Sequence, residues 1–263
     1  SPATTDVDTL PFPTAHGTLD LSVSTVSGTS RGKPFVAHVA QVGDPRFMGF
    51  QLPAQGCGHK QKTSETAAAL GCKLAINGGF FSIATGACVS NTVVNGTVYN
   101  VGGGLGSNFA LTADSIVTGY VTDADLKTNA LHAVSLLQGA GFLVRGGQPY
   151  ANTSLAMGEV SQAFAVEMAP RTAVCAQANS TVLLVVVDGE EDIKAGADLF
   201  MMEDILLRLG CFTAVNLDGG GSSVMTVRDG SVYKWVSHPT CDDSPTPCER
   251  EVTSIACVSD TPL

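Results

Sequence analysis

The hydrophobic and polar positions of this chain follow the two-residue period of β-strands more often than the period of a helix. Leucine and valine alternate with polar residues over 18–26, which is typical of a half-buried strand. The run 181–187 is continuous, apolar and β-branched, and predicts a central strand buried on both faces. The clearest helix covers 199–209, where the apolar side chains fall on one face and Asp198 precedes them as a cap.

Shorter stretches with the same signals account for most of the remaining chain. Further strands are predicted at 34–42, 73–76, 107–111, 115–121, 142–145, 163–168, 172–176, 214–217 and 252–258. Short helices are predicted at 63–70 and 124–131, hairpins at 91–100 and 225–235, and no regular element at 151–161. Together these elements predict an α+β fold, a single strand-rich domain over 1–263 with mixed sheets and few helices.

Three of the predicted strands end in a polar residue followed directly by glycine. These strand ends are Asn77-Gly78-Gly79, Asp188-Gly189 and Asp218-Gly219-Gly220-Gly221. Glycine permits positive φ angles and lets backbone N–H groups approach a ligand closely. We therefore expect the strand ends to converge on a pocket for a polar substrate. The simpler alternative at Asp218 is a tight turn in which the carboxylate binds its own backbone.

Composition and charge narrow the class of protein. Of the 263 residues, 44% are hydrophobic, 14% are charged and 29 are glycine, which favours a strand- and turn-rich domain. The net charge of −10 opposes binding to nucleic acid or anionic membranes, so a phosphate-bearing substrate needs local positive charge. The longest apolar run, 182–187, is too short to cross a bilayer, so we expect a soluble chain without membrane contact. No signal peptide stands at Ser1, which indicates a processed or trimmed form.

The cysteines and glycosylation sequons indicate a protein of the secretory pathway. Eight cysteines form an even set without the paired spacing of a zinc site. Cys241 and Cys248 enclose a short loop and are expected to pair with each other. Sequons for N-glycosylation begin at Asn95, Asn152 and Asn179, all in predicted turns or loops.

Three separated motifs carry a resemblance to a known family. They are Ile76-Asn77-Gly78-Gly79-Phe80-Phe81, Pro170-Arg171-Thr172-Ala173 and Val215-Asn216-Leu217-Asp218-Gly219-Gly220-Gly221-Ser222-Ser223. With these motifs, most of the chain resembles the phosphodiester glycosidase family. The resemblance implies two disulfides, Cys57–Cys88 and Cys72–Cys257. We interpret the remaining Cys175 and Cys211 as a fourth bridge, because neither has a neighbouring base that would activate a catalytic thiol.

The resemblance also implies an activity. The family's enzymes hydrolyse sugar-1-phosphodiesters, and the implied reaction releases N-acetylglucosamine without a cofactor or a metal. The implied substrates are phosphorylated high-mannose glycans of lysosomal hydrolases, on which the reaction exposes mannose 6-phosphate. The implied location is the secretory pathway, in the Golgi lumen, or outside the cell if no anchor follows. A homo-oligomer is compatible with the sequence.

The chemistry of such a substrate suggests roles for the residues of the motifs. Cleavage at the anomeric carbon develops oxocarbenium character on the sugar and negative charge on the departing phosphate. We assign Asp218 as nucleophile or base, with Asp188 as the alternative carboxylate. Arg171 is expected to clamp the phosphate, or to form a salt bridge with one of these aspartates, and Asn77 to orient the substrate. The other substrate-binding candidates are Gly78, Gly79, Thr172, Gly219, Gly220, Gly221 and Ser222.

Three other functions fit parts of the sequence. A carbohydrate-binding module would keep the pocket but release no sugar. A hydrolase of another sugar-phosphodiester polymer would differ in pocket depth, which the loops around Gly103 and Asn152 would set. A calcium-binding adhesion domain would use Asp188, Asp218 and the acidic stretch 190–192. However, no run has EF-hand spacing, and a solvated loop is the simpler interpretation of 190–192.

Overall fold

The computed structural model describes residues 2–14, 17–102, 104–241 and 246–262, so that Gly103 lies outside the described residues. Three sheets of seven, six and five strands make up most of this part of the chain, and two further strands form a separate pair. The pairings between these strands are all antiparallel, where mixed sheets were expected. Short hairpin connections explain part of the difference, because two strands joined by a tight turn can only run antiparallel. Other antiparallel pairs, such as 182–187 with 37–42, are far apart in the chain.

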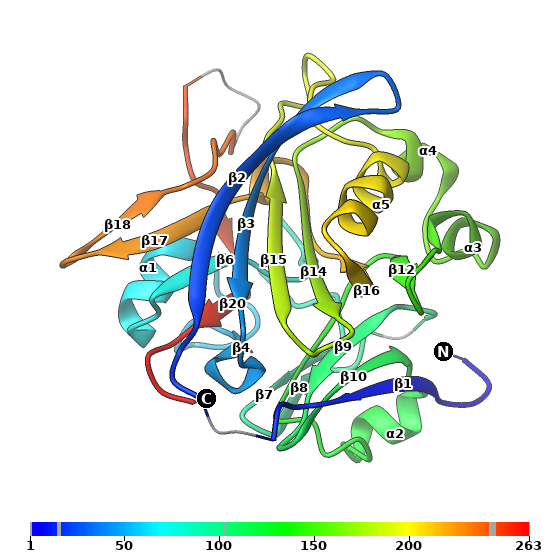
Figure 1. Ribbon diagram of the computed structural model, residues 1–263. Coiled ribbons are helices and arrows are strands. Elements are labelled where there is room, and N and C mark those ends of the chain that lie inside the picture. The colour runs from blue at the N-terminus through cyan, green and yellow to red at the C-terminus, as the bar shows by residue number, and fades with distance from the viewer. Residues whose placement is uncertain (1, 15–16, 103, 242–245, 263) are drawn as a thin grey trace.

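The seven-stranded sheet contains the strand that leads to Asp218. Its order is β13 (Gln148–Pro149), β12 (Phe142–Arg145), β16 (Cys211–Asn216), β14 (Arg171–Gln177), β15 (Val182–Val187), β3 (Lys33–Val42) and β2 (Leu21–Ser30). Every residue of β15 is buried, as its continuous apolar sequence predicted. Helix α5 (Leu199–Arg208) lies across one face of this sheet (Figure 1).

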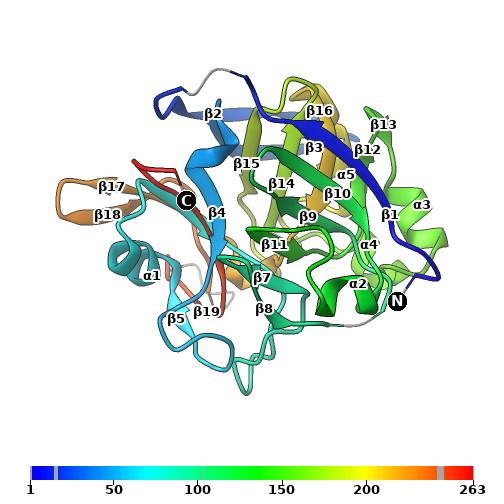
Figure 2. The same ribbon diagram turned by 90° about the horizontal axis from the view of Figure 1, so that it is seen from below.

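The other two large sheets pack around the opposite face. The six-stranded sheet, nearest the viewer in Figure 2, has the order β1 (Asp6–Pro11), β10 (Ser115–Tyr120), β9 (Asn108–Leu111), β11 (Ser135–Gln138), β7 (Thr92–Val94) and β8 (Thr97–Asn100). The five-stranded sheet has the order β18 (Val232–Trp235), β17 (Met225–Asp229), β6 (Leu74–Asn77), β20 (Ile255–Val258) and β4 (Met48–Gln51). The two-stranded pair is β19 (Glu251–Val252) with β5 (Gln61–Lys62).

Two apolar clusters cover the two faces of the seven-stranded sheet. One is shared by all three large sheets and includes Phe50, Ile76, Phe109, Val215 and Met225. The other lies between the sheet and the predicted apolar face of α5, where leucine, methionine and isoleucine side chains are almost fully buried. This double burial fixes the positions of β14 and β16, and hence of the loops at their ends.

The helices show where the sequence-based predictions were wrong. The described helices besides α5 are α1 (Thr63–Leu70), α2 (Asp123–Lys127), α3 (Ala151–Ala156) and α4 (Gln162–Val166). The predicted strand 163–168 is largely helix α4, whose start is capped by the Ser161 hydroxyl accepting from Phe164 N. The stretch 151–161, expected to lack regular structure, contains α3, so that Asn152 lies on a helix rather than in a loop. The predicted strand 252–258 is split into β19 and β20.

The described structure forms four disulfides, and they join the expected pairs. These are Cys57–Cys88, Cys72–Cys257, Cys175–Cys211 and Cys241–Cys248. The sequon residues Asn95, Asn152 and Asn179 are all exposed. Asn95 and Gly96 both have positive φ (49° and 74°), as the predicted type I′ turn requires. Among the described helices, none combines the length and the apolar character needed to cross a membrane.

Candidate active site

The ends of β6 and β16 meet through a set of hydrogen bonds around Asp218. Asp218 N donates to Gly78 O (3.1 Å), and the Asn77 side-chain amide donates to Asp218 O (2.6 Å). The Asn77 oxygen accepts from the Thr172 hydroxyl (2.8 Å) and from Val224 N (3.2 Å). Both Asn77 and Thr172 are fully buried. Their polar groups therefore hold the loop that starts at Asp218, and these contacts leave little of them for a substrate.

Asp218 itself has the environment of a reactive carboxyl. One oxygen accepts from Gly219 N (3.1 Å), so the turn expected as the simpler alternative is also present. Burial raises the pKa of Asp218 to about 7, while the Ser222 hydroxyl and the charge of Arg250 oppose this rise. The negative charge of Glu191 adds to it. Near neutral pH the group therefore exchanges between acid and carboxylate, which is the range useful for acid–base catalysis.

Two glycines allow charged side chains to approach this loop. Gly220 has φ +57°, and a Cβ built on it would overlap the carboxylate of Glu191. A Cβ on Gly221 would overlap the guanidinium of Arg250. A larger residue at either position would displace one of these charges from its place beside the loop.

Glu191 and Arg250 are the residues that the sequence analysis missed. Glu191 was assigned to a solvated acidic loop, and Arg250 was not distinguished from the other basic residues. Arg250 Nε donates to Cys241 O (3.0 Å), so the Cys241–Cys248 disulfide loop holds this cation beside Gly221. A basic residue just beyond a disulfide was the available signal, but it does not indicate which part of the fold the loop reaches.

Arg171 lies beside Gly219 of the glycine loop. It is only 1% exposed, and its guanidinium donates to three backbone carbonyls, Ala197 O (3.1 Å), Phe164 O (3.2 Å) and Glu167 O (2.7 Å). It also lies 4.6 Å from the ring centroid of Phe164. Its ion pair is with the Glu167 carboxylate (3.8 Å), not with Asp188 or Asp218 as the salt-bridge alternative had it. Burial lowers the pKa of the guanidinium.

Asp188 is occupied by other parts of the chain. One of its oxygens lies 2.8 Å from His38 Nε2, and the other accepts from His238 N (2.8 Å). The second ring nitrogen of His38 lies 3.1 Å from the Thr25 hydroxyl, so His38 is a buried, satisfied residue as expected. These contacts tie the end of β15 to β3 and to the segment after β18. Both carboxylate oxygens of Asp188 therefore have partners within the chain, and its role as the alternative carboxylate stays a prediction.

A cavity has Arg250 in its wall, the residue whose guanidinium also lies against Gly221 of the Asp218 loop. Its volume is about 280 Å³. The described residues that line it are Lys60, Phe81, Ile83, Cys241, Glu249, Arg250 and Glu251. Lys60 and Arg250 provide positive charge, Glu249 and Glu251 provide negative charge, and Ile83 is an exposed apolar side chain. Within the described residues, no three or more His, Cys, Asp or Glu side chains are grouped so as to hold a metal ion.

Comparison with known proteins gives these positions a context. The profile of the phosphodiester glycosidase family matches residues 70–259. N-acetylglucosamine-1-phosphodiester alpha-N-acetylglucosaminidase of Mus musculus is 33% identical over 252 residues, which are 90% of this chain and 48% of that protein. The Homo sapiens enzyme of the same name is 30% identical, over 94% of this chain and 50% of that protein. The chain thus spans about half the length of these curated relatives.

Solved structures agree in fold. The zebrafish N-acetylglucosamine-1-phosphodiester alpha-N-acetylglucosaminidase catalytic domain, auto-inhibited by its pro-peptide, superposes with a TM-score of 0.84 and 25% identity. The match covers 98% of this chain and 88% of that one. A hypothetical protein from Synechocystis shares the fold at a TM-score of 0.65 and 14% identity, over 90% of this chain and 61% of the other.

Proposed function

This chain belongs to the phosphodiester glycosidase family, and from that premise we propose that it hydrolyses an N-acetylglucosamine-1-phosphodiester. The products are free N-acetylglucosamine and a phosphomonoester. The observation that carries the proposal is the Asp218 carboxyl, with a pKa near neutrality, at a glycine loop that Arg250 and Glu191 both approach. A carboxyl on this loop and a cation beside the loop match the two charges that the reaction develops.

Asp218 acts at the anomeric carbon. As a carboxylate it either attacks this carbon and forms a glycosyl ester that water then hydrolyses, or takes a proton from the attacking water. In both cases the bond from the anomeric carbon to the phosphate oxygen breaks, and its electron pair leaves with the phosphate. Because the phosphate is a better leaving group than an alkoxide, the reaction does not need a strong general acid. The proton of the neutral carboxyl is nevertheless available, since the pKa of Asp218 lies at about 7.

Arg250 takes the role in phosphate binding that the sequence analysis gave to Arg171. Its guanidinium lies against Gly221 and borders the open cavity that also contains Lys60. The Ser222 hydroxyl and the backbone N–H groups of the loop add neutral donors. Arg171, whose donors bind the carbonyls of α4 and its flanking loops, packs against Gly219 and so supports the loop.

The substrates and the location follow from the same proposal. We infer that the phosphodiester is carried on high-mannose glycans of lysosomal hydrolases and that the reaction exposes mannose 6-phosphate. Four disulfides and three exposed sequons support an oxidising compartment, for which the Golgi lumen is our proposal. The residues 1–263 are proposed to act as one catalytic domain.

Replacement of the carboxyl tests the proposal. Release of N-acetylglucosamine from an N-acetylglucosamine-phospho-mannoside is measured for Asp218→Asn and, as a matched control, for the exposed Asp229→Asn. We expect kcat to fall by about 10³-fold or more in Asp218→Asn, because the amide can neither attack nor accept a proton. The control is expected to keep the kcat of the unmodified chain. A folded Asp218→Asn variant with near-normal kcat would remove Asp218 from the reaction.

A further inference from the structure

The segment that carries Arg250 is attached to the fold on both sides of this residue. Before it, Cys248 is bonded to Cys241, and Arg250 Nε donates to Cys241 O (3.0 Å). Directly after it, the chain enters strand β19, which pairs with β5. Glu249 lies between the disulfide and Arg250. The contacts of its side chain therefore affect how the segment presents the guanidinium.

Glu249 uses both of its carboxylate oxygens within the chain. The residue is only 7% exposed. Oε1 accepts from Ser64 N (2.7 Å), and Oε2 accepts from the Ser64 hydroxyl (2.7 Å) and from Trp235 Nε1 (3.0 Å). Three donors hold this carboxylate in one orientation. Although Glu249 contributes to the wall of the cavity that contains Arg250, its oxygens are bound to other parts of the protein.

One of these partners is the N-terminal end of helix α1. Ser64 is the second residue of the helix, and its N–H is one of those that the helix cannot pair by itself. Within the described structure, the N-cap residue Lys62 makes no side-chain hydrogen bond to these groups. Glu249 supplies the missing acceptor from a position 185 residues later, and its negative charge suits this end of a helix. Helix α1 precedes β6, whose last residue, Asn77, binds Asp218 O.

The other partner belongs to the hairpin of β17 and β18. Trp235 is the last residue of β18, which pairs with β17, and β17 in turn pairs with β6. Glu249 therefore joins the Arg250 segment to α1 and to the five-stranded sheet. These are the elements that also position Asn77 beneath the start of the Asp218 loop.

We propose that Glu249 is a positioning residue for Arg250, because its bonds to Ser64 and Trp235 hold the segment so that the guanidinium stays against Gly221. The inference rests on the proposed function, since it explains how the phosphate-binding cation is kept in place. A Cβ on Gly221 would overlap this guanidinium, so the contact is close, and a small shift of the segment would break it. Through its charge alone, Glu249 would act in the opposite sense, because a carboxylate in the wall of the cavity repels phosphate.

Binding of inorganic phosphate separates these two effects without any need for turnover. Its Kd is measured by titration calorimetry for the unmodified chain, Arg250→Ala, Glu249→Ala and the variant with both changes. We expect each single change to weaken binding about tenfold. The variant with both changes should bind no more weakly than Arg250→Ala, because Glu249 acts through the guanidinium that is already absent. If Glu249 acted only through its charge, Glu249→Ala would bind phosphate more tightly than the unmodified chain.

The conservative replacement tests whether the hydrogen bonds of Glu249 are responsible. Glu249→Gln keeps the shape of the side chain and an amide oxygen that accepts from Ser64, but it removes the charge. We expect its Kd for phosphate to stay within about threefold of that of the unmodified chain. A gain in affinity equal to that of a charge-only effect would contradict the positioning role.

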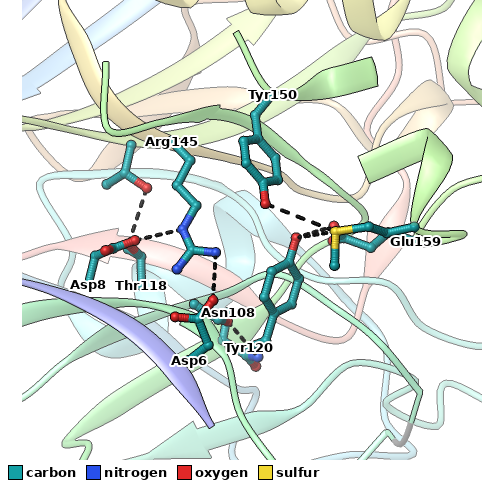
Figure 3. A network of polar contacts seen from close by, with 11 residues as sticks. Asp6, Asp8, Asn108, Thr118, Tyr120, Arg145, Tyr150 and Glu159 are labelled. Carbon is teal, nitrogen blue, oxygen red and sulfur yellow. Dashed lines mark hydrogen bonds and ion pairs between the residues drawn. The ribbon is translucent and has the colours of Figure 1, made fainter. Parts of the chain in front are cut away.

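Asp8→Ala is the matched control, because Asp8 also joins two elements through its carboxylate. It accepts from Arg145 Nε (2.7 Å), whose guanidinium lies 5.4 Å from the ring centroid of Tyr120, and the Tyr120 hydroxyl donates to Glu159 (Figure 3). This network ties β1 to β12, on the opposite side of the molecule from β18 (Figures 1 and 2). Loss of Asp8 should lower stability but leave the Kd for phosphate unchanged.

Ser64→Ala/Trp235→Phe covers the case in which Glu249→Ala does not fold. This variant keeps the carboxylate but removes both donors to Oε2, and we expect phosphate binding to weaken about threefold or more. Unchanged or tighter binding in folded Glu249→Ala, or in this variant where Glu249→Ala does not fold, would overturn the positioning role. If the Kd depends on Glu249 as expected but no phosphodiester is hydrolysed, the proposed function fails and the positioning role stands.

Discussion

The pKa of Asp218 determines how activity should depend on pH. Because burial raises this pKa to about 7, the group is mostly protonated at pH 5 and mostly a carboxylate at pH 8. If the carboxylate is the active form, kcat/KM should rise with pH over this range, with its midpoint near 7. A pH–rate profile on an N-acetylglucosamine-phospho-mannoside measures this midpoint. A profile that falls over the same range would mean that the protonated form of Asp218 is the active one.

The same shift has an effect on stability with the opposite pH dependence. Since the pKa of Asp218 is higher in the folded state than its ordinary value of 3.8, the folded chain binds more protons than the unfolded chain between these values. Stability from this group is therefore present below about pH 4 and lost as pH rises through 7. We expect Asp218→Asn, which cannot ionise, to melt above the unmodified chain at pH 8. Melting curves at pH 4 and pH 8 should show this difference only at the higher pH.

A comparison of charged and uncharged substrates tests whether Arg250 binds the phosphate. Arg250→Ala should lower kcat/KM on a phosphodiester by about 10- to 100-fold, because it removes a charged donor. An uncharged aryl N-acetylglucosaminide should be affected much less. The midpoint of the pH profile should also move upward, since Arg250 lowers the pKa of Asp218. Arg228→Ala, which removes an ion pair with Asp260, is the matched control. Equal losses on both substrates would remove Arg250 from phosphate binding.

The residues of the site differ in how well the sequence could predict them. Asp218 is part of a local pattern, a buried strand followed by glycines, and local patterns are visible in sequence. The positions of Glu191 and Arg250 depend on where two loops lie in the folded chain, and the hydrophobic periodicity of the sequence does not specify the position of a loop. The burial of Arg171 also depends on the fold, because its carbonyl partners belong to α4 and to the loop before α5.

At the scale of elements, the long periodic segments and the short helices α1 and α2 were predicted, whereas the short helices α3 and α4 were not. The predicted strands that became β3, β15 and β16, and the helix α5, have apolar positions that match their burial. Helices α3 and α4 have only six and five residues, too few for a helical period to appear. Their positions are set by contacts with the rest of the fold, such as the Ser154 hydroxyl donating to Phe142 O (2.8 Å).

Arg171 connects α4 to the seven-stranded sheet, and removal of its side chain should weaken the packing of α4 against this sheet. Arg171→Ala leaves the carbonyls of Phe164, Glu167 and Ala197 without their donor, and we expect a loss of about 3 kcal/mol or more in the free energy of unfolding. Urea unfolding measures this loss. Arg208→Ala, on the exposed side of α5, should cost less than about 0.5 kcal/mol.

Activity measurements on charged and uncharged substrates show whether Arg171 supports the glycine loop or binds the phosphate. If Arg171 supports the glycine loop, its replacement should reduce activity on charged and uncharged substrates alike. A stable Arg171→Ala variant with a selective defect on phosphodiesters would instead restore the clamp that the sequence analysis assigned to it.

At the scale of the whole molecule, the order of the strands in the sheets could not be predicted from the sequence. The central strand β15 lies between β14 and β3, and β3 belongs to a hairpin more than a hundred residues earlier in the chain. Alternation indicates which face of a strand is buried, but it does not indicate which strand lies beside it. The disulfide pairs supplied part of this missing information, because Cys72–Cys257 joins the region of β6 to β20 across most of the chain.

We therefore expect Cys72–Cys257 to contribute mainly to the stability of the fold, and Cys241–Cys248 mainly to the position of Arg250 in the site. Cys72–Cys257 spans a sequence separation of 185 and Cys241–Cys248 one of 7. Loop-closure entropy gives about 5 kcal/mol for the first bridge and about 2.5 kcal/mol for the second. We expect the double variant Cys72→Ala/Cys257→Ala to lose more unfolding free energy while it keeps its KM at temperatures where it remains folded.

Cys241→Ala/Cys248→Ala should lose less stability but raise KM for a phosphodiester, because Cys241 O holds the guanidinium of Arg250. Urea unfolding and KM measured on both variants test the division. The opposite order, with the larger KM change in Cys72→Ala/Cys257→Ala, would mean that the position of Arg250 depends on the packing of the sheets rather than on its own short loop.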